Sequence, residues 1–94
     1  MQTVHLLISG KVQGVFFRET SRKVAEKLNI KGWIKNTPDE KVEAVITGEE
    51  NDVNDFIKWC KKGPERAEVT DVIVTPLGDH LYHEFTVIRE EPHE

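Results

Sequence analysis

The stretch TVHLLISGKVQGVFFRETSRKVAEKL, residues 3–28, decides the fold of this chain. Its first part, Thr3–Ser9, is apolar at every second position, and this period is typical of a β-strand: Val4, Leu6 and Ile8. From Arg18 onward the apolar and small residues follow the period of a helix instead: Ser21, Val24, Ala25 and Leu28. The sequence therefore predicts a strand, a loop over residues 10–14 and a helix that stops near Asn29, a residue type that tolerates a left-handed backbone.

The rest of the chain repeats this pattern of strands and helices. A second helix, with acidic residues at its start and lysines near its end, is predicted between Gly48 and Gly63, and Pro64 follows it. The further predicted strands are residues 32–36, 41–47, 69–75 and 82–89, with turns at 37–40 and 76–79. The first six elements follow the order β-α-β-β-α-β, and an irregular stretch is expected before the last strand, residues 82–89. This order favours an α+β, ferredoxin-like fold in which two helices cover one face of an antiparallel sheet.

Length and composition limit the functional classes. The chain has 94 residues, enough for one domain, and we expect residues 1–94 to form it. With 13 basic and 17 acidic residues its net charge is −4, which argues against a nucleic-acid-binding protein. No apolar run is long enough to span a membrane, and the single cysteine cannot form an intramolecular disulfide. We therefore expect a cytoplasmic protein without nucleic-acid or membrane partners, and its small size suggests a monomer.

The segment between the first strand and the first helix, GKVQGVFFR at residues 10–18, carries the candidate chemistry. Backbone N–H groups at the start of a helix have no helical partner and can bind an anion, aided by the helix dipole. Gly14 lets the backbone approach a ligand closely, and Arg18 could grip the same anion with its guanidinium group. The alternative interpretation, an ordinary corner with a solvent-exposed Arg18, remains open. The segment is not a nucleotide-binding P-loop, because it lacks the Gly-Lys-Ser/Thr ending of that motif.

Residues 10–18 closely resemble the signature of the acylphosphatases, which reads roughly Gly-x-Val-Gln-Gly-Val-x-Phe-Arg. A second signature, Gly-Trp-Val-x-Asn, is matched by residues 32–36 with isoleucine in place of valine. Residues 42–43 and 82–85 are also similar to the family. The resemblance implies an enzyme that hydrolyses acyl phosphates to a carboxylate and inorganic phosphate without a metal ion or other cofactor.

The resemblance also implies roles for individual residues. The phosphoryl group would be held by the backbone amides of the loop and by its arginine: Gln13, Gly14, Val15, Phe16, Phe17 and Arg18. Asn36 would position the attacking water, with Thr37 as a helper. If the first and second strands are neighbours in the sheet, Asn36 lies close to the loop. The family commonly has Asp-Gly in the following hairpin where this chain has Asp39-Glu40, so Glu40 is expected in a left-handed conformation or the turn is rebuilt around Pro38.

Other residues carry no comparable signal for chemistry, and two alternative functions remain open. Cys60 lies on the apolar face of the second predicted helix and is interpreted as a buried structural thiol. The histidines are scattered and predict no metal site. The first alternative function is a non-catalytic domain that binds phosphate or carbamoyl phosphate. The second is an RNA-binding module, which residues 69–75 argue against because they contain no aromatic side chain.

Overall fold

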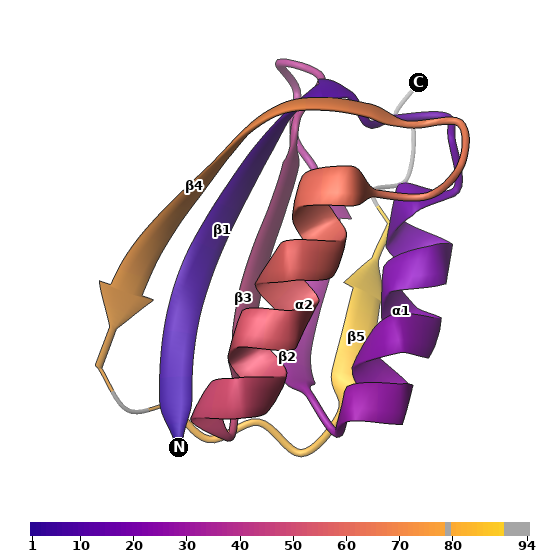
Figure 1. Ribbon diagram of the computed structural model, residues 1–94. Coiled ribbons are helices and arrows are strands. Elements are labelled where there is room, and N and C mark those ends of the chain that lie inside the picture. Colours follow the sequence, from indigo (N-terminus) through magenta and orange to yellow (C-terminus); the bar gives the residue numbers. More distant parts are fainter. Residues whose placement is uncertain (79, 90–94) are drawn as a thin grey trace.

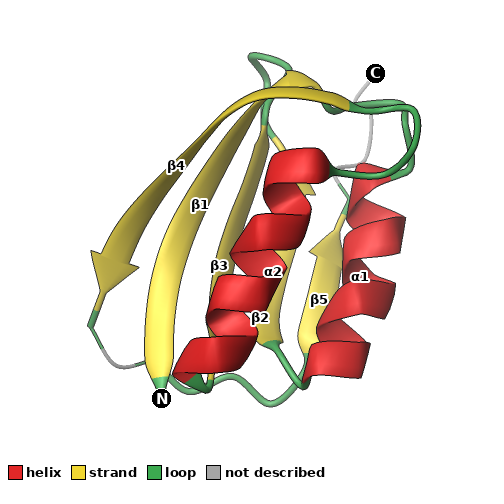
Figure 2. Cartoon of the chain, in the orientation of Figure 1, coloured by secondary structure: helices red, strands yellow, loops and turns green. Residues whose placement is uncertain are grey.

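A computed structural model describes residues 1–78 and 80–89. This part of the chain contains five strands and two helices, with both helices against one face of a single sheet (Figures 1 and 2). The arrangement confirms the predicted ferredoxin-like fold. The elements in chain order are β1 (Gln2–Lys11), α1 (Phe17–Leu28), β2 (Lys31–Asn36), β3 (Val42–Gly48), α2 (Glu50–Lys62), β4 (Glu68–Leu77) and β5 (Phe85–Ile88).

The strands lie in the order β4-β1-β3-β2-β5, and this order corrects two expectations. First, β1 and β2 are not neighbours, because β3 lies between them and pairs with both. Second, the sheet is mixed rather than wholly antiparallel, because β5 pairs parallel to β2 while the other three pairings are antiparallel. In Figure 1, β5 begins at the end of the sheet where β4 finishes. A strand that returns from that end runs opposite to β4, and it is therefore parallel to β1 and β2.

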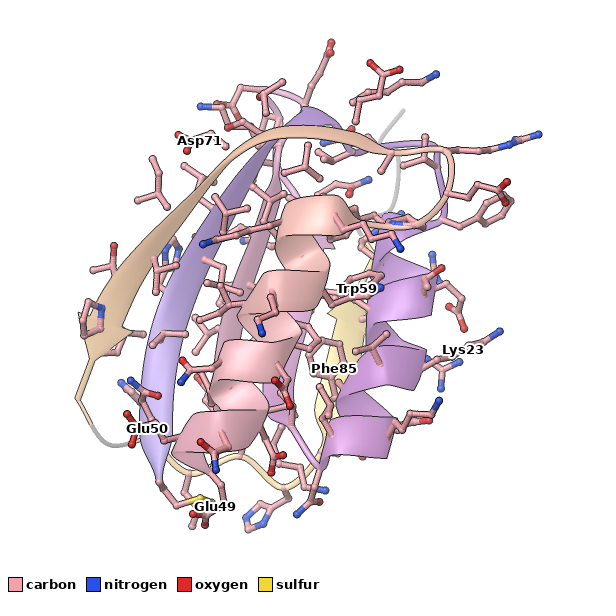
Figure 3. The ribbon with its side chains drawn as sticks, in the orientation of Figure 1. Lys23, Glu49, Glu50, Trp59, Asp71 and Phe85 are labelled. Atoms are coloured by element: carbon pink, nitrogen blue, oxygen red, sulfur yellow. The ribbon has the colours of Figure 1, made fainter. Side chains whose placement is uncertain are left out.

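The hydrophobic core lies between the helices and the sheet. The predicted inward positions of β1 are buried, and each helix buries one face: Val4, Leu6 and Ile8 from β1, Phe17, Ser21 and Ala25 from α1, and Val53, Phe56 and Cys60 from α2. The prediction that Cys60 is a buried thiol is therefore confirmed. In Figure 3, Trp59 and Phe85 are seen between the two helices, whereas Lys23 points away from α1. Phe56 lies between these two aromatics, with ring centroids 6.2 Å from Trp59 and 5.9 Å from Phe85.

Several element boundaries differ from the predicted ones. β4 continues through Pro76, which was predicted to lie in a turn, and it can do so because an edge strand tolerates a residue without an N–H group. Of the predicted turn at 76–79, Asp79 lies outside the described residues. β5 begins at Phe85 and has only four residues. Asn29 ends α1 with a φ of 58°, as predicted. No helix within the described ranges has the length and apolar character needed to cross a membrane.

Candidate active site

A pocket of about 400 Å³ opens where the loop between β1 and α1 meets the ends of β2 and β5. The loop and the first turn of α1 form most of its wall. Its lining residues are Val12, Gly14, Phe16, Phe17, Arg18, Glu19, Asn36 and Arg89. Five of the residues that the sequence singled out are therefore brought together, namely Gly14, Phe16, Phe17, Arg18 and Asn36. Gln13 and Val15 do not line the pocket.

The loop turns sharply just before α1. Gly14 has a φ of 72° and Phe16 a φ of 64°, so two residues with left-handed backbones reverse the chain within three positions. The first hydrogen bond of the helix, 3.0 Å long, is donated by the N–H group of Thr20 to the carbonyl oxygen of Phe16. None of the N–H groups of residues 13–18 donates a hydrogen bond to another described residue. This run of free donors lies at the positive end of the α1 dipole, where an anion is favoured.

Arg18 is held at the pocket by contacts on both sides. Its Nη1 donates a hydrogen bond of 3.3 Å to the carbonyl oxygen of Ile88, the last residue of β5. The hydroxyl of Ser21 donates to the carbonyl oxygen of Arg18 at 2.7 Å, within the first turn of α1. Partial burial, and after it the charge of the neighbouring Arg89, lowers the pKa of Arg18 from its usual value. The guanidinium group still carries its charge near neutral pH.

Gln13 connects the loop to the hairpin between β2 and β3. Its side-chain Nε2 donates hydrogen bonds of 2.9 Å to the carbonyl oxygens of both Thr37 and Lys41. The side chain of Val15 points neither to the pocket nor to the hairpin, because it is buried in the core. The side chains of these two residues therefore fix the position of the loop rather than face the pocket.

Asn36 reaches the pocket although β1 and β2 are not adjacent. It is the last residue of β2 and pairs with Val42 of β3, which pairs on its other side with Ile8. Because β1 and β2 run in the same direction, their C-terminal ends lie at one end of the sheet, two strand spacings or about 10 Å apart. The Oδ1 atom of Asn36 is shielded from solvent and accepts no hydrogen bond from any described residue. An unpartnered buried polar atom is uncommon in a folded protein.

Thr37 belongs to the hairpin turn. Its hydroxyl donates to a carboxylate oxygen of Asp39 and accepts a 2.9 Å hydrogen bond from the N–H group of Lys41. The hydrogen bond from Thr37 is also the main reason that the pKa of Asp39 lies below its usual value. Glu40 completes the turn with a φ of 70°, so of the two alternatives expected for this turn the left-handed Glu40 is the one observed.

Glu19 and Arg89 line the pocket but were not singled out in the sequence. Their side chains form an ion pair, with 3.0 Å between Arg89 Nη2 and Glu19 Oε1. Glu19 carries no motif signal, and Arg89 is 70 positions away from it in the chain, so neither residue could be assigned to the pocket without the fold. Within residues 1–78 and 80–89, no three His, Cys, Asp or Glu side chains are grouped so as to hold a metal ion.

The fold and the pocket together define a small ferredoxin-like protein with a run of free N–H donors at the start of its first helix. A family model described as Acylphosphatase matches residues 4–87. The acylphosphatase of Syntrophus aciditrophicus is 40% identical, and the match covers 97% of this chain and 96% of that protein. That of Rubrobacter xylanophilus is 48% identical over 76% of this chain and 64% of its own length. The crystal structure of acylphosphatase from Bacillus subtilis superposes with a TM-score of 0.90 at 34% identity and covers 94% of this chain and 99% of that one. The chain belongs to the acylphosphatase family.

Proposed function

We propose that this acylphosphatase cleaves the bond between the carboxyl and phosphoryl groups of an acyl phosphate in the pocket, and releases a carboxylate and inorganic phosphate. The observation that carries the proposal is the run of unpartnered N–H groups at residues 13–18 beside the guanidinium group of Arg18. Phosphoryl transfer depends mainly on positioning and on stabilising charge at the phosphoryl oxygens. The N–H groups and Arg18 supply both functions from the protein's own residues.

Asn36 is proposed to position the attacking water. Asn36 lines the pocket, and its shielded Oδ1 accepts no hydrogen bond from the described residues, so no such bond opposes a rotation of the side chain that would turn Oδ1 toward a water molecule. A neutral amide is sufficient for this task, because the leaving group is a carboxylate whose conjugate acid has a pKa of about 4. Such a group departs without a strong general acid, and a phosphoryl oxygen of the substrate can accept the proton of the water.

The remaining expectations extend this proposal. We propose that residues 1–94 form one domain that acts as a monomer in the cytoplasm, on a small substrate. The continuous core of both helices and the sheet supports a single domain, and the lone buried Cys60 has no need of an oxidising compartment. Size-exclusion chromatography with light scattering tests the monomer directly, and a stable dimer would contradict it.

The test of the function is hydrolysis of benzoyl phosphate, followed by its ultraviolet absorbance in buffer with EDTA. We expect turnover that the chelator does not change and that inorganic phosphate inhibits competitively. Arg18→Ala should lower kcat/KM by at least about 100-fold, because it removes a charged contact to the transition state. Arg66→Ala is the matched control, because it removes an exposed guanidinium that does not line the pocket. Near-normal turnover in Arg18→Ala would overturn the proposed site.

Asn36→Ala separates water positioning from phosphate binding. We expect turnover to be lost while phosphate still binds, as measured by isothermal calorimetry. Equal loss of both properties would make Asn36 a ligand contact instead. A folded wild-type protein that binds phosphate without turnover would support the alternative of a non-catalytic binding domain.

A further inference from the structure

Two guanidinium groups share the pocket. Arg89 directly follows Ile88, whose carbonyl oxygen accepts the hydrogen bond from Arg18, and both arginines line the pocket. The charge of Arg89 is one of the two causes that lower the pKa of Arg18. Two like charges held this close repel each other, so the arrangement favours an anion that both can contact.

Glu19 holds Arg89 at the rim of the pocket. Its carboxylate pairs with Arg89 at 3.0 Å through one oxygen, and with Arg22 of α1 through the other. Arg22 in turn contacts Glu26 at 3.3 Å. The side chain of Arg89 is 56% exposed, so it is not fixed by packing and can change partners at little cost. A carboxylate at the rim therefore competes with any anion in the pocket for the same guanidinium group.

We propose that Arg89 is a second substrate-binding cation, which contacts the phosphoryl group of the acyl phosphate alongside Arg18, and that Glu19 holds Arg89 at the rim while the pocket is empty and so competes with the substrate for it. The inference rests on the proposed function, because it places the phosphoryl group against residues 13–18. A phosphoryl group carries about two negative charges near neutral pH. Arg18 balances one of them, and Arg89 balances the other.

A purely structural role for the Glu19–Arg89 pair predicts a different result. The pair joins α1 to the residue after β5, so it could serve only as a tether between them. If it were only a tether, loss of either partner would loosen the pocket in the same way. If Glu19 instead competes for Arg89, loss of the two partners changes phosphate binding in opposite directions.

The experiment measures the competitive inhibition constant of inorganic phosphate, with KM and kcat for benzoyl phosphate, in Arg89→Ala, Glu19→Gln and the double variant. Arg89→Ala should raise the inhibition constant and KM about fivefold, with a smaller change in kcat, as suits a partly exposed charge contact. Glu19→Gln should lower the inhibition constant. In the double variant the gain from Glu19→Gln should be lost, because no Arg89 remains to be released. Arg22→Ala is the control, because it removes the other arginine that pairs with Glu19 and leaves the Glu19–Arg89 pair in place.

Three results would overturn the inference. In the first, both single variants weaken phosphate binding, which would identify a tether. In the second, Glu19→Gln strengthens binding equally with and without Arg89, so that Glu19 acts by its charge alone. In the third, Arg89→Ala binds phosphate normally. If Arg89→Ala does not fold, Arg89→Lys replaces it, and that variant should retain most of the binding because it keeps the charge. Arg18→Ala separates the two proposals, since normal phosphate binding in that variant would refute the proposed site as a whole.

Discussion

The side-chain amide of Gln13 donates a 2.9 Å hydrogen bond to the backbone carbonyl oxygen of Thr37, the residue next to Asn36. The same nitrogen donates to Lys41 on the other side of the hairpin. Through these two bonds the loop that is proposed to hold phosphate and the residue that is proposed to hold water are fixed relative to each other. We therefore expect Gln13 to affect the reaction without lining the pocket.

Gln13→Met tests this connection, because it keeps the length of the side chain and removes both donors. We expect the free energy of unfolding to fall by about 1–2 kcal/mol, since two partly buried hydrogen bonds are lost. We also expect kcat for benzoyl phosphate to fall more than phosphate affinity, because Asn36 loses its fixed distance from the loop. Urea unfolding and steady-state kinetics measure the two effects. Lys11→Met, at the exposed end of β1, is the control, and an unchanged kcat in Gln13→Met would show that the hairpin holds its position unaided.

The turn at Glu40 predicts a stabilising substitution. Glu40 is exposed and has a φ of 70°, a conformation that costs a residue with a Cβ about 1 kcal/mol. Glu40→Gly should therefore raise the free energy of unfolding by up to about 0.5 kcal/mol, after the greater flexibility of glycine in the unfolded chain is allowed for. Glu40→Ala is the matched control and should give no such gain, because alanine retains the Cβ. An equal gain in both variants would mean that the glutamate charge, not the backbone, is unfavourable.

The sequence predicted the parts of the site that depend on local patterns. The spacing of residues 10–18 indicated a strand-to-helix corner with a glycine and an arginine, and both residues line the pocket. The left-handed φ of Glu40 was one of the two alternatives that the family's Asp-Gly at this turn implied. Each of these features is decided by residues close together in the chain, so the local sequence is enough to predict it.

Features that depend on distant pairing could not be predicted in the same way. The position of β3 between β1 and β2 and the parallel course of β5 arise from how strands far apart in the sequence share one sheet. Arg89 enters the pocket only because β5 ends beside the start of α1. The direction of the Gln13 side chain, toward the hairpin rather than the pocket, likewise needs both segments in place.

Gly32 and Gly14 form a matched pair of glycines with positive φ and different surroundings. At Gly32, φ 135°, a Cβ atom would lie 1.9 Å from the carbonyl oxygen of Val45 in the neighbouring strand, whereas at Gly14, φ 72°, it would meet nothing within 4 Å. Gly32→Ala must displace the backbone of β3 and should cost about 2–4 kcal/mol of the free energy of unfolding. Gly14→Ala should cost only about 1 kcal/mol, from its backbone conformation. Thermal and urea unfolding of both variants check the difference, and equal losses would contradict the steric argument.

Cys60 predicts a dependence of stability on alkaline pH. Burial raises the pKa of its thiol far above the ordinary value of 9.0, so the folded protein keeps the thiol protonated where the unfolded chain ionises it. The stability that this contributes is fully present below the unfolded pKa and is lost as the pH rises above it. Between about pH 9 and 11 the wild type should therefore lose up to about 1.4 kcal/mol per pH unit more than Cys60→Ala, in which the thiol is absent.

Urea unfolding of both proteins across this pH range measures that difference, because all other titrating groups are common to the two. Cys60 is fully buried on α2, away from the pocket, so Cys60→Ala should hydrolyse benzoyl phosphate at the wild-type rate. The native thiol should also react with iodoacetamide only as fast as the protein opens. Parallel stability curves for the two proteins, or rapid labelling of the folded wild type, would mean that water reaches Cys60 in the native state.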